Sequence, residues 1–195
     1  MRAVLTQANG RKLILLARKA IAEYADSRRT MRSADFPDKR GVFVSLHSFP
    51  SRELRGCIGF PYPVRPLGEA VCEAAVSAAF GDPRFPPVDA DEMKHVLVEV
   101  SVLTPPEEIT VKKRDDIPKK IKIGRDGLIV QMGPYSGLLL PQVPVEWKWD
   151  ARQFLEHLCG KAGLASDYWK DSRAKICRFE AQVFSEKKPS ESESL

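Results

Sequence analysis

The chain has 195 residues, of which 31 are Lys or Arg and 26 are Asp or Glu, so its formal net charge is +5. Hydrophobic residues make up 43% of the sequence, a share typical of folded proteins, which excludes disorder of the whole chain. No apolar run approaches the ~18 residues of a membrane-spanning helix, and no secretory signal is recognised at the start, so a cytoplasmic location is expected.

The first half of the chain alternates helical and extended patterns. Apolar residues at helical spacing predict a helix over 13–24. β-branched and aromatic residues predict strands over 41–47 and 54–59, which we expect to pair as a hairpin. An Ala-rich segment predicts a helix over 67–80, and alternating valines predict a strand over 96–103.

The second half is expected to continue without a regular β-α-β rhythm, which predicts an α+β fold. A hairpin is expected between Ile121–Ile123 and 128–132, around a Gly-Arg-Asp-Gly turn. Asp150 is expected to cap a helix, and a last strand is expected over 177–183 with its odd-numbered residues facing inward. The polar tail, 185–195, is predicted to be disordered.

The distribution of Cys, His and Gly argues against several cofactors. None of the four cysteines lies in a C-x-x-C pair, and a metal site using Cys57 and His47 has only two evident ligands. No glycine-rich phosphate loop is present, so we expect neither a metal nor a nucleotide cofactor. The basic stretch 112–122 is interrupted by acidic residues and lacks aromatics, which is typical of a solvated surface.

The segment Leu54–Gly59, with the sequence Leu-Arg-Gly-Cys-Ile-Gly, is the most informative. In a regular strand Arg55 and Cys57 point to the same face, and a nearby arginine favours a thiolate over a thiol. Gly56 and Gly59 remove side chains beside the sulfur, so a ligand could approach. The structural alternative is that both glycines serve packing, Cys57 is buried, and Arg55 pairs with a carboxylate.

A second candidate group follows the Ala-rich helix. Pro83 restricts its own φ and so holds Asp82 and Arg84 in a stiff turn. The two charged residues could grip a substrate or orient a nucleophile, or they could form an internal clamp that shapes the loop. His47 could serve as the base for Cys57 if the strand register brings them together, although a surface histidine at a strand end is the simpler interpretation.

Six motifs occur in an order shared with one protein family. They lie at 41–46, 54–59, 82–85, 98–103, 137–143 and 161–164. Through them the chain resembles the AMMECR domain family, named after a chromosomal region associated with Alport syndrome, mental retardation, midface hypoplasia and elliptocytosis. The resemblance implies an AMMECR-type domain over residues 1–184, with two lobes around a mainly antiparallel sheet, flanking helices and a cleft near Leu54–Gly59.

The resemblance implies partners but no demonstrated activity. By this resemblance, members of the family look like genomic and fusion partners of radical SAM and Memo-like proteins. A protein of one of these two classes is therefore the expected partner. The leading hypothesis is an enzyme, or a component of one, that uses Cys57 as a thiolate stabilised by Arg55, with Asp82, Arg84 or His47 positioning a substrate. The alternative is a non-catalytic binding module for a protein partner, RNA or another anionic ligand.

Overall fold

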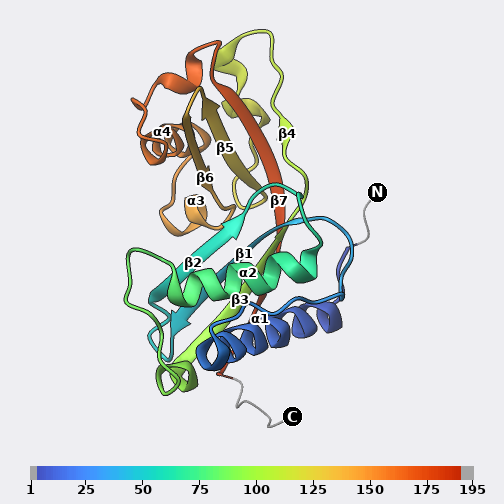
Figure 1. Cartoon of the computed structure of the whole chain (residues 1–195). Coiled ribbons are helices and arrows are strands. Elements are labelled where there is room, and N and C mark those ends of the chain that lie inside the picture. The colour runs from blue at the N-terminus through green and yellow to red at the C-terminus, as the bar shows by residue number, and fades with distance from the viewer. Residues whose placement is uncertain (1–3, 190–195) are drawn as a thin grey trace. The chain divides into compact units, whose positions relative to one another are not determined.

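The computed structural model describes residues 4–189, and the chain forms two compact units (Figure 1). The first unit contains the chain up to Leu103 and again from Gln182, and the second contains Thr104–Ala181. Both units combine helices with antiparallel strands, which confirms the predicted α+β class.

The described helices and strands follow one another in a mixed order. They are α1 (Gln7–Ser27), β1 (Gly41–Ser48), β2 (Leu54–Phe60), α2 (Leu67–Phe80), β3 (Val96–Leu103), β4 (Glu107–Glu108), β5 (Asp126–Met132), β6 (Tyr135–Leu139), α3 (Val143–Glu146), α4 (Ala151–Lys161) and β7 (Lys175–Ser185). Short 3₁₀ helices are η1 (Glu92–His95), η2 (Arg114–Asp116), η3 (Pro118–Lys120) and η4 (Tyr168–Lys170). The predicted strands over 41–47 and 96–103 and the helix over 67–80 are confirmed.

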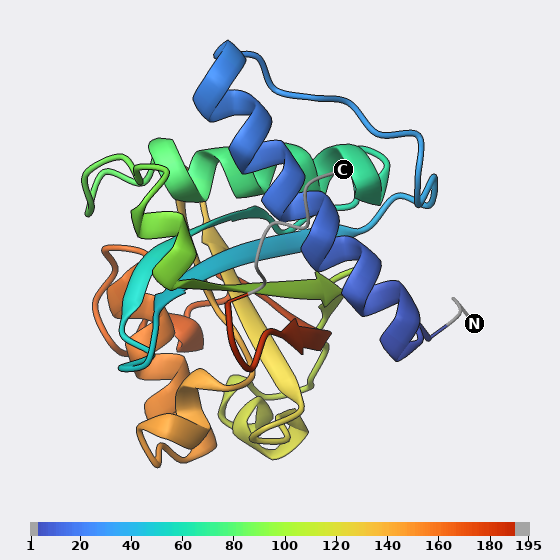
Figure 2. The same cartoon turned by 90° about the horizontal axis from the view of Figure 1, so that it is seen from below.

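The core of the first unit lies between a sheet and two helices. β1 is the central strand and pairs in antiparallel fashion with β2 and β3. α1 and α2 cover one face of these strands, as Figure 2 shows from below. The buried side chains of this core include Leu13, Ile21, Val42, Val44, Leu46, Val71, Ala75, Val98 and Val100. Alternation along β1 therefore leaves its other residues on the opposite face.

Helix α1 begins earlier than its apolar pattern predicts. Thr6 caps it and forms a capping box with Asn9, so the helix starts at Gln7 rather than at residue 13. The first turns are largely exposed and carry no apolar stripe, so periodicity could not detect them. At α4 the sequence signal was sufficient, because Asp150 forms the predicted capping box with the residue three positions later.

The predicted hairpin in the second unit is wrong. β5 pairs with β6 across a turn at Gly133 and with β7 on its other edge, whereas residues 121–123 form no strand. The physical reason is a side-chain turn: Asp126 accepts a hydrogen bond from the Lys122 N–H at 2.8 Å, which closes the chain before a second strand can form. Buried residues of this unit's core include Ile117, Leu128, Val130, Phe154, Leu155, Leu158, Trp169 and Ile176.

The last strand also departs from its predicted alternation. Cys177 and Phe179 are buried as expected, but Val183 is 43% exposed and Phe184 is buried. β7 passes from the second unit into the first at Gln182, and Phe184 packs into the core of the first unit. A single inward face therefore does not persist along the whole strand.

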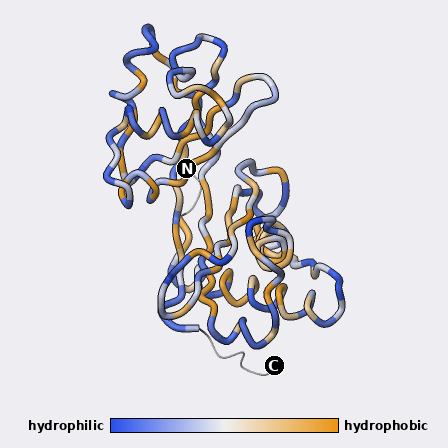
Figure 3. Tube along the Cα trace, turned by 90° about the vertical axis from the view of Figure 1, so that its left-hand side faces the viewer, coloured by the Kyte–Doolittle hydropathy of each residue, from blue (hydrophilic) through white to orange (hydrophobic). Residues whose placement is uncertain are grey.

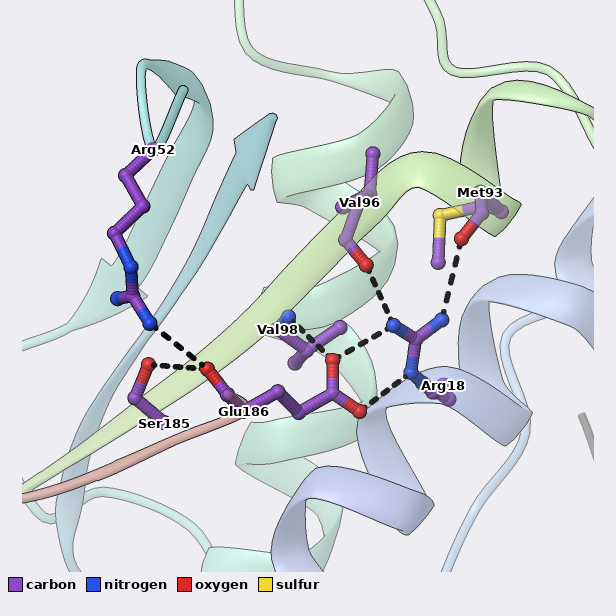
Figure 4. A network of polar contacts seen from close by, with 7 residues as sticks. All are labelled: Arg18, Arg52, Met93, Val96, Val98, Ser185 and Glu186. Carbon is purple, nitrogen blue, oxygen red and sulfur yellow. Dashed lines mark hydrogen bonds and ion pairs between the residues drawn. The ribbon is translucent and has the colours of Figure 1, made fainter. Parts of the chain in front are cut away.

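Glu186, which the sequence places in the polar tail, is buried and anchored (Figure 4). Its carboxylate accepts hydrogen bonds from Arg18 at 2.7 and 2.8 Å and from the Val98 N–H at 2.8 Å. Arg18 also donates to the Val96 carbonyl at 2.6 Å. This network ties the segment after β7 to α1 and β3, while the predicted disorder of 190–195 lies outside the described residues.

Hydropathy along the chain follows this organisation. In Figure 3 the outer loops are mostly hydrophilic, and hydrophobic stretches lie along strands and packed helices. Among residues 4–189, no helix combines the length and apolar character required to cross a bilayer.

Candidate functional site

The hairpin of β1 and β2 places Ser45 directly opposite Cys57. The Ser45 hydroxyl donates to Cys57 Sγ at 3.3 Å. Both residues lie on the face opposite the helices, because Val44 and Leu46 point into the core. Cys57 is partly exposed, whereas the other three cysteines are buried. Cys57 is thus the one cysteine of the four that is not fully buried, and its sulfur accepts a hydrogen bond from Ser45.

The loop after α2 contacts β2 at Cys57. The buried Asp82 carboxylate accepts the Cys57 N–H at 2.9 Å and the Arg84 N–H at 3.1 Å. It also pairs with the Arg84 guanidinium, at 2.9 Å from Nε and 2.6 Å from Nη2. Arg84 Nη2 in turn lies 3.3 Å from the Cys57 carbonyl oxygen. Asp82 and Arg84 thus clamp their own loop and hold the cysteine backbone.

The charges of this group are coupled. The Arg84 guanidinium holds the pKa of Asp82 well below its ordinary value; the Cys57 and Arg84 N–H groups add to this effect, and burial opposes it. The pKa of Arg84 is raised, chiefly by its hydrogen bond to Asp82 and further by the charge of a Cys57 thiolate. Asp82 and Arg84 are therefore held in their charged forms, and the Arg84 guanidinium lies beside the Cys57 backbone.

Arg55 has a different role in the structure from the one its position in the sequence suggests. A β-bulge interrupts the pairing between β1 and β2 at this residue, so regular alternation with Cys57 does not apply. Arg55 pairs with Glu92 through two nitrogens, and its Nη2 donates to the Pro86 carbonyl at 2.8 Å. Its Nη1 is buried and has no hydrogen-bond partner among residues 4–189. Its positive charge is therefore matched by Glu92.

The two motif glycines are required for close packing. A Cβ at Gly56 would lie 2.2 Å from the Ala78 carbonyl oxygen, and one at Gly59 would lie 2.3 Å from the Val42 carbonyl oxygen. These distances are far shorter than van der Waals contact, and the obstructing atoms belong to the backbone. The glycines therefore allow β2 to approach α2 and β1.

His47 is not paired with Cys57. It lies opposite Leu54 in the register, and its Nδ1 is 3.2 Å from the Arg52 carbonyl oxygen. Its Nε2 is buried and lacks a partner among the described residues. Ser45 instead contacts the sulfur, and the sequence offered no signal for it beyond an uncertain hairpin register. No cluster of three or more potential metal ligands was found among residues 4–189.

The motifs that surround this site also match a known family. The AMMECR1 family model matches residues 14–184, which include both candidate segments. The chain belongs to the AMMECR1 family. Protein MJ0810 of Methanocaldococcus jannaschii is 52% identical, with 95% of this chain and 94% of that protein covered. Protein MK0488 of Methanopyrus kandleri is 53% identical, and the match covers 95% of this chain and 92% of that protein.

A solved structure shares the fold of this AMMECR1 family member. The crystal structure of the uncharacterized protein PH0010 from Pyrococcus horikoshii has 51% sequence identity and a TM-score of 0.87, with 92% of each chain covered. The predicted family and the α+β fold are therefore both confirmed. The chemistry of the Cys57 group must be argued from its own geometry.

Proposed function

We propose that this AMMECR1 family protein is a cysteine-dependent enzyme, or the cysteine-bearing component of one. Cys57 would attack an electrophilic carbon of the substrate, forming a sulfur–carbon bond while the leaving group departs with the electron pair of the broken bond. The observation that carries the proposal is the partly exposed residue Cys57, whose Sγ lies 3.3 Å from the Ser45 hydroxyl and whose backbone N–H is held by Asp82.

Each neighbour has a defined role in this proposal. Ser45 donates to the sulfur and stabilises negative charge on it. Arg84 supplies the nearby cation, and because its side chain is 49% exposed it can also meet a negatively charged substrate. We assign this role to Arg84 rather than to Arg55, because Arg84 Nη2 lies 3.3 Å from the Cys57 carbonyl oxygen, whereas Arg55 contacts Glu92 and the Pro86 carbonyl. Asp82 is a positioning residue that orients Arg84 and the Cys57 peptide.

The rate of alkylation of Cys57 tests the proposal. Wild-type protein is treated with iodoacetamide near neutral pH, and modification is mapped by mass spectrometry and compared with a model thiol. We expect Cys57 to react faster than the model thiol, and Ser45→Ala and Arg84→Gln to slow the reaction several-fold. The buried Cys72 and Cys159 provide internal references that should remain unmodified.

The activated-thiolate mechanism fails if folded wild-type protein reacts no faster than the model thiol. Circular dichroism of the variants is the control, because a slower reaction must not arise from unfolding. A Cys57→Ser variant then separates catalysis from docking. If it fully restores a deletion strain, the protein acts as a non-catalytic binding module.

A binding module is the second candidate, favoured because Asp82 already pairs with Arg84 and the motif glycines are used in packing. The partner class, a radical SAM or Memo-like protein, rests on the family resemblance alone.

A further inference from the structure

A tryptophan of the second unit is left largely in solvent. Trp147 is 67% exposed, and its ring stacks on Trp149 with centroids 6.0 Å apart and planes 19° apart. Trp149 stacks in turn on His157, with ring centroids 3.8 Å apart and ring planes 10° apart. We call these three rings the Trp147 stack. One face of Trp147 lies against Trp149, and the high exposure of the residue leaves the other face open.

The chain holds the stack in a fixed geometry. After the short helix α3, the Trp147 N–H donates to the Val143 carbonyl at 3.1 Å, and the Trp149 N–H donates to the Pro144 carbonyl at 2.8 Å. Lys148, between the two tryptophans, has a φ of 55°, a left-handed conformation that is unfavourable for a residue with a Cβ. Trp149 also packs against the core of the second unit. Backbone hydrogen bonds and the packing of Trp149 thus position the exposed Trp147 ring.

Lysines without ion pairs lie on the segments that carry the stack and on a turn that contacts α3. Lys148 separates the tryptophans, Lys161 follows the histidine by one turn of α4, and Lys122 lies in the turn that approaches α3. These three lysines are exposed, and none has an ion pair within the part of the chain that the structure describes. The carboxylates of these segments are Asp126, Glu146, Asp150 and Glu156. Asp126 pairs with Arg125, Glu156 pairs with Arg152, and Asp150 caps α4. The local charge balance is therefore positive.

We propose that the Trp147 stack binds single-stranded nucleic acid, with one base on the open face of Trp147 and the exposed lysines contacting phosphates. Every base presents a π-face, so such a surface binds with little sequence preference. A protein partner would also cover an exposed tryptophan, but the parallel ring stack and the unpaired lysines favour a planar base attached to a phosphate chain. The site is separate from Cys57 and does not depend on its reactivity.

Fluorescence measurements with a short oligouridine test the proposal. Anisotropy of the labelled oligonucleotide measures affinity, and intrinsic tryptophan fluorescence reports stacking, because Trp169, the third tryptophan of the chain, is buried. We expect quenching of wild type on binding. Trp147→Ala should weaken affinity about 5- to 150-fold, the range produced by loss of one stacked base. Trp147→Phe should retain part of the affinity.

Two further variants sharpen the test. Tyr135→Ala is the matched control, because Tyr135 is a 51% exposed aromatic residue of the same unit outside the stack, and this variant should bind like wild type. Lys161→Gln should lower the slope of log affinity against log salt by about 0.7, the contribution of one phosphate contact in a single strand. Thermal unfolding confirms that each variant is folded.

Three outcomes overturn the proposal. The first is no binding of oligouridine by wild type at low ionic strength. The second is equal affinity of Trp147→Ala and Tyr135→Ala for the oligonucleotide. The third is quenching that follows protein concentration without nucleic acid, with sedimentation showing a dimer, which would identify the stack as a contact between copies of the chain.

Discussion

Replacing Asp82 by Asn tests whether the loop after α2 holds the Cys57 segment. The Asp82 side chain is 2% exposed and accepts hydrogen bonds from the backbone N–H groups of Cys57 and Arg84 and from the Arg84 guanidinium. Asp82→Asn preserves size but removes the charge opposite the guanidinium. Breaking a buried ion pair costs about 3–5 kcal/mol and an exposed one about 0.2–1 kcal/mol. Because Arg84 is 49% exposed, we expect a loss of about 2 kcal/mol of unfolding free energy.

Urea unfolding followed by circular dichroism measures this loss near neutral pH. Asp91→Asn is the matched control: Asp91 is 91% exposed and pairs with Lys94 at the surface, so its replacement should leave stability unchanged within error. If Asp82→Asn costs less than about 0.5 kcal/mol, the scatter of ordinary surface substitutions, the clamp does not stabilise the unit as described.

The difference in unfolding free energy between wild type and Asp82→Asn should depend on pH. The pKa of Asp82 is lower in the folded protein than in the unfolded chain, mainly because of the Arg84 guanidinium. The unfolded chain therefore binds the proton more readily, so stability from Asp82 is present above its ordinary pKa of about 4 and is lost as pH falls. The free-energy difference between wild type and Asp82→Asn should be constant from about pH 5 to 8 and shrink below about pH 4. A difference that persists unchanged at about pH 3 contradicts this assignment.

Three further substitutions, two in the first unit and one in the second, are tested by the same unfolding measurement. Glu186→Ala should cost about 3 kcal/mol, because it leaves the largely buried Arg18 without its carboxylate. A loss below about 1 kcal/mol would show that the ion pair does not anchor this segment. Gly56→Ala should cost about 2 kcal/mol or more, because its Cβ would meet the Ala78 carbonyl, whereas Gly160→Ala, in open space within α4, should gain about 0.5–1 kcal/mol. Equal effects of the two glycine substitutions would refute the packing role of Gly56.

The roles of the two arginines show where local sequence reasoning ends. Arg55 is two residues from Cys57, and strict strand alternation would place both side chains on one face. A β-bulge removes that alternation, and Glu92, from a distant part of the chain, pairs with the guanidinium. Arg84, which is 27 residues from Cys57 in sequence, contacts its carbonyl group instead. A bulge and a loop contact of this kind have no local sequence signature.

The amino-acid sequence alone determined the family, the α+β class, most strands of the first unit and the capped start of α4. These features follow from periodicity, capping residues and motifs, which act over a few neighbouring residues. Only the tertiary structure decided that Ser45 contacts the Cys57 sulfur, that Asp82 holds its backbone and that Glu186 is buried. The physical reason is that strand register and long-range polar contacts depend on how distant segments pack, which no short stretch of sequence specifies.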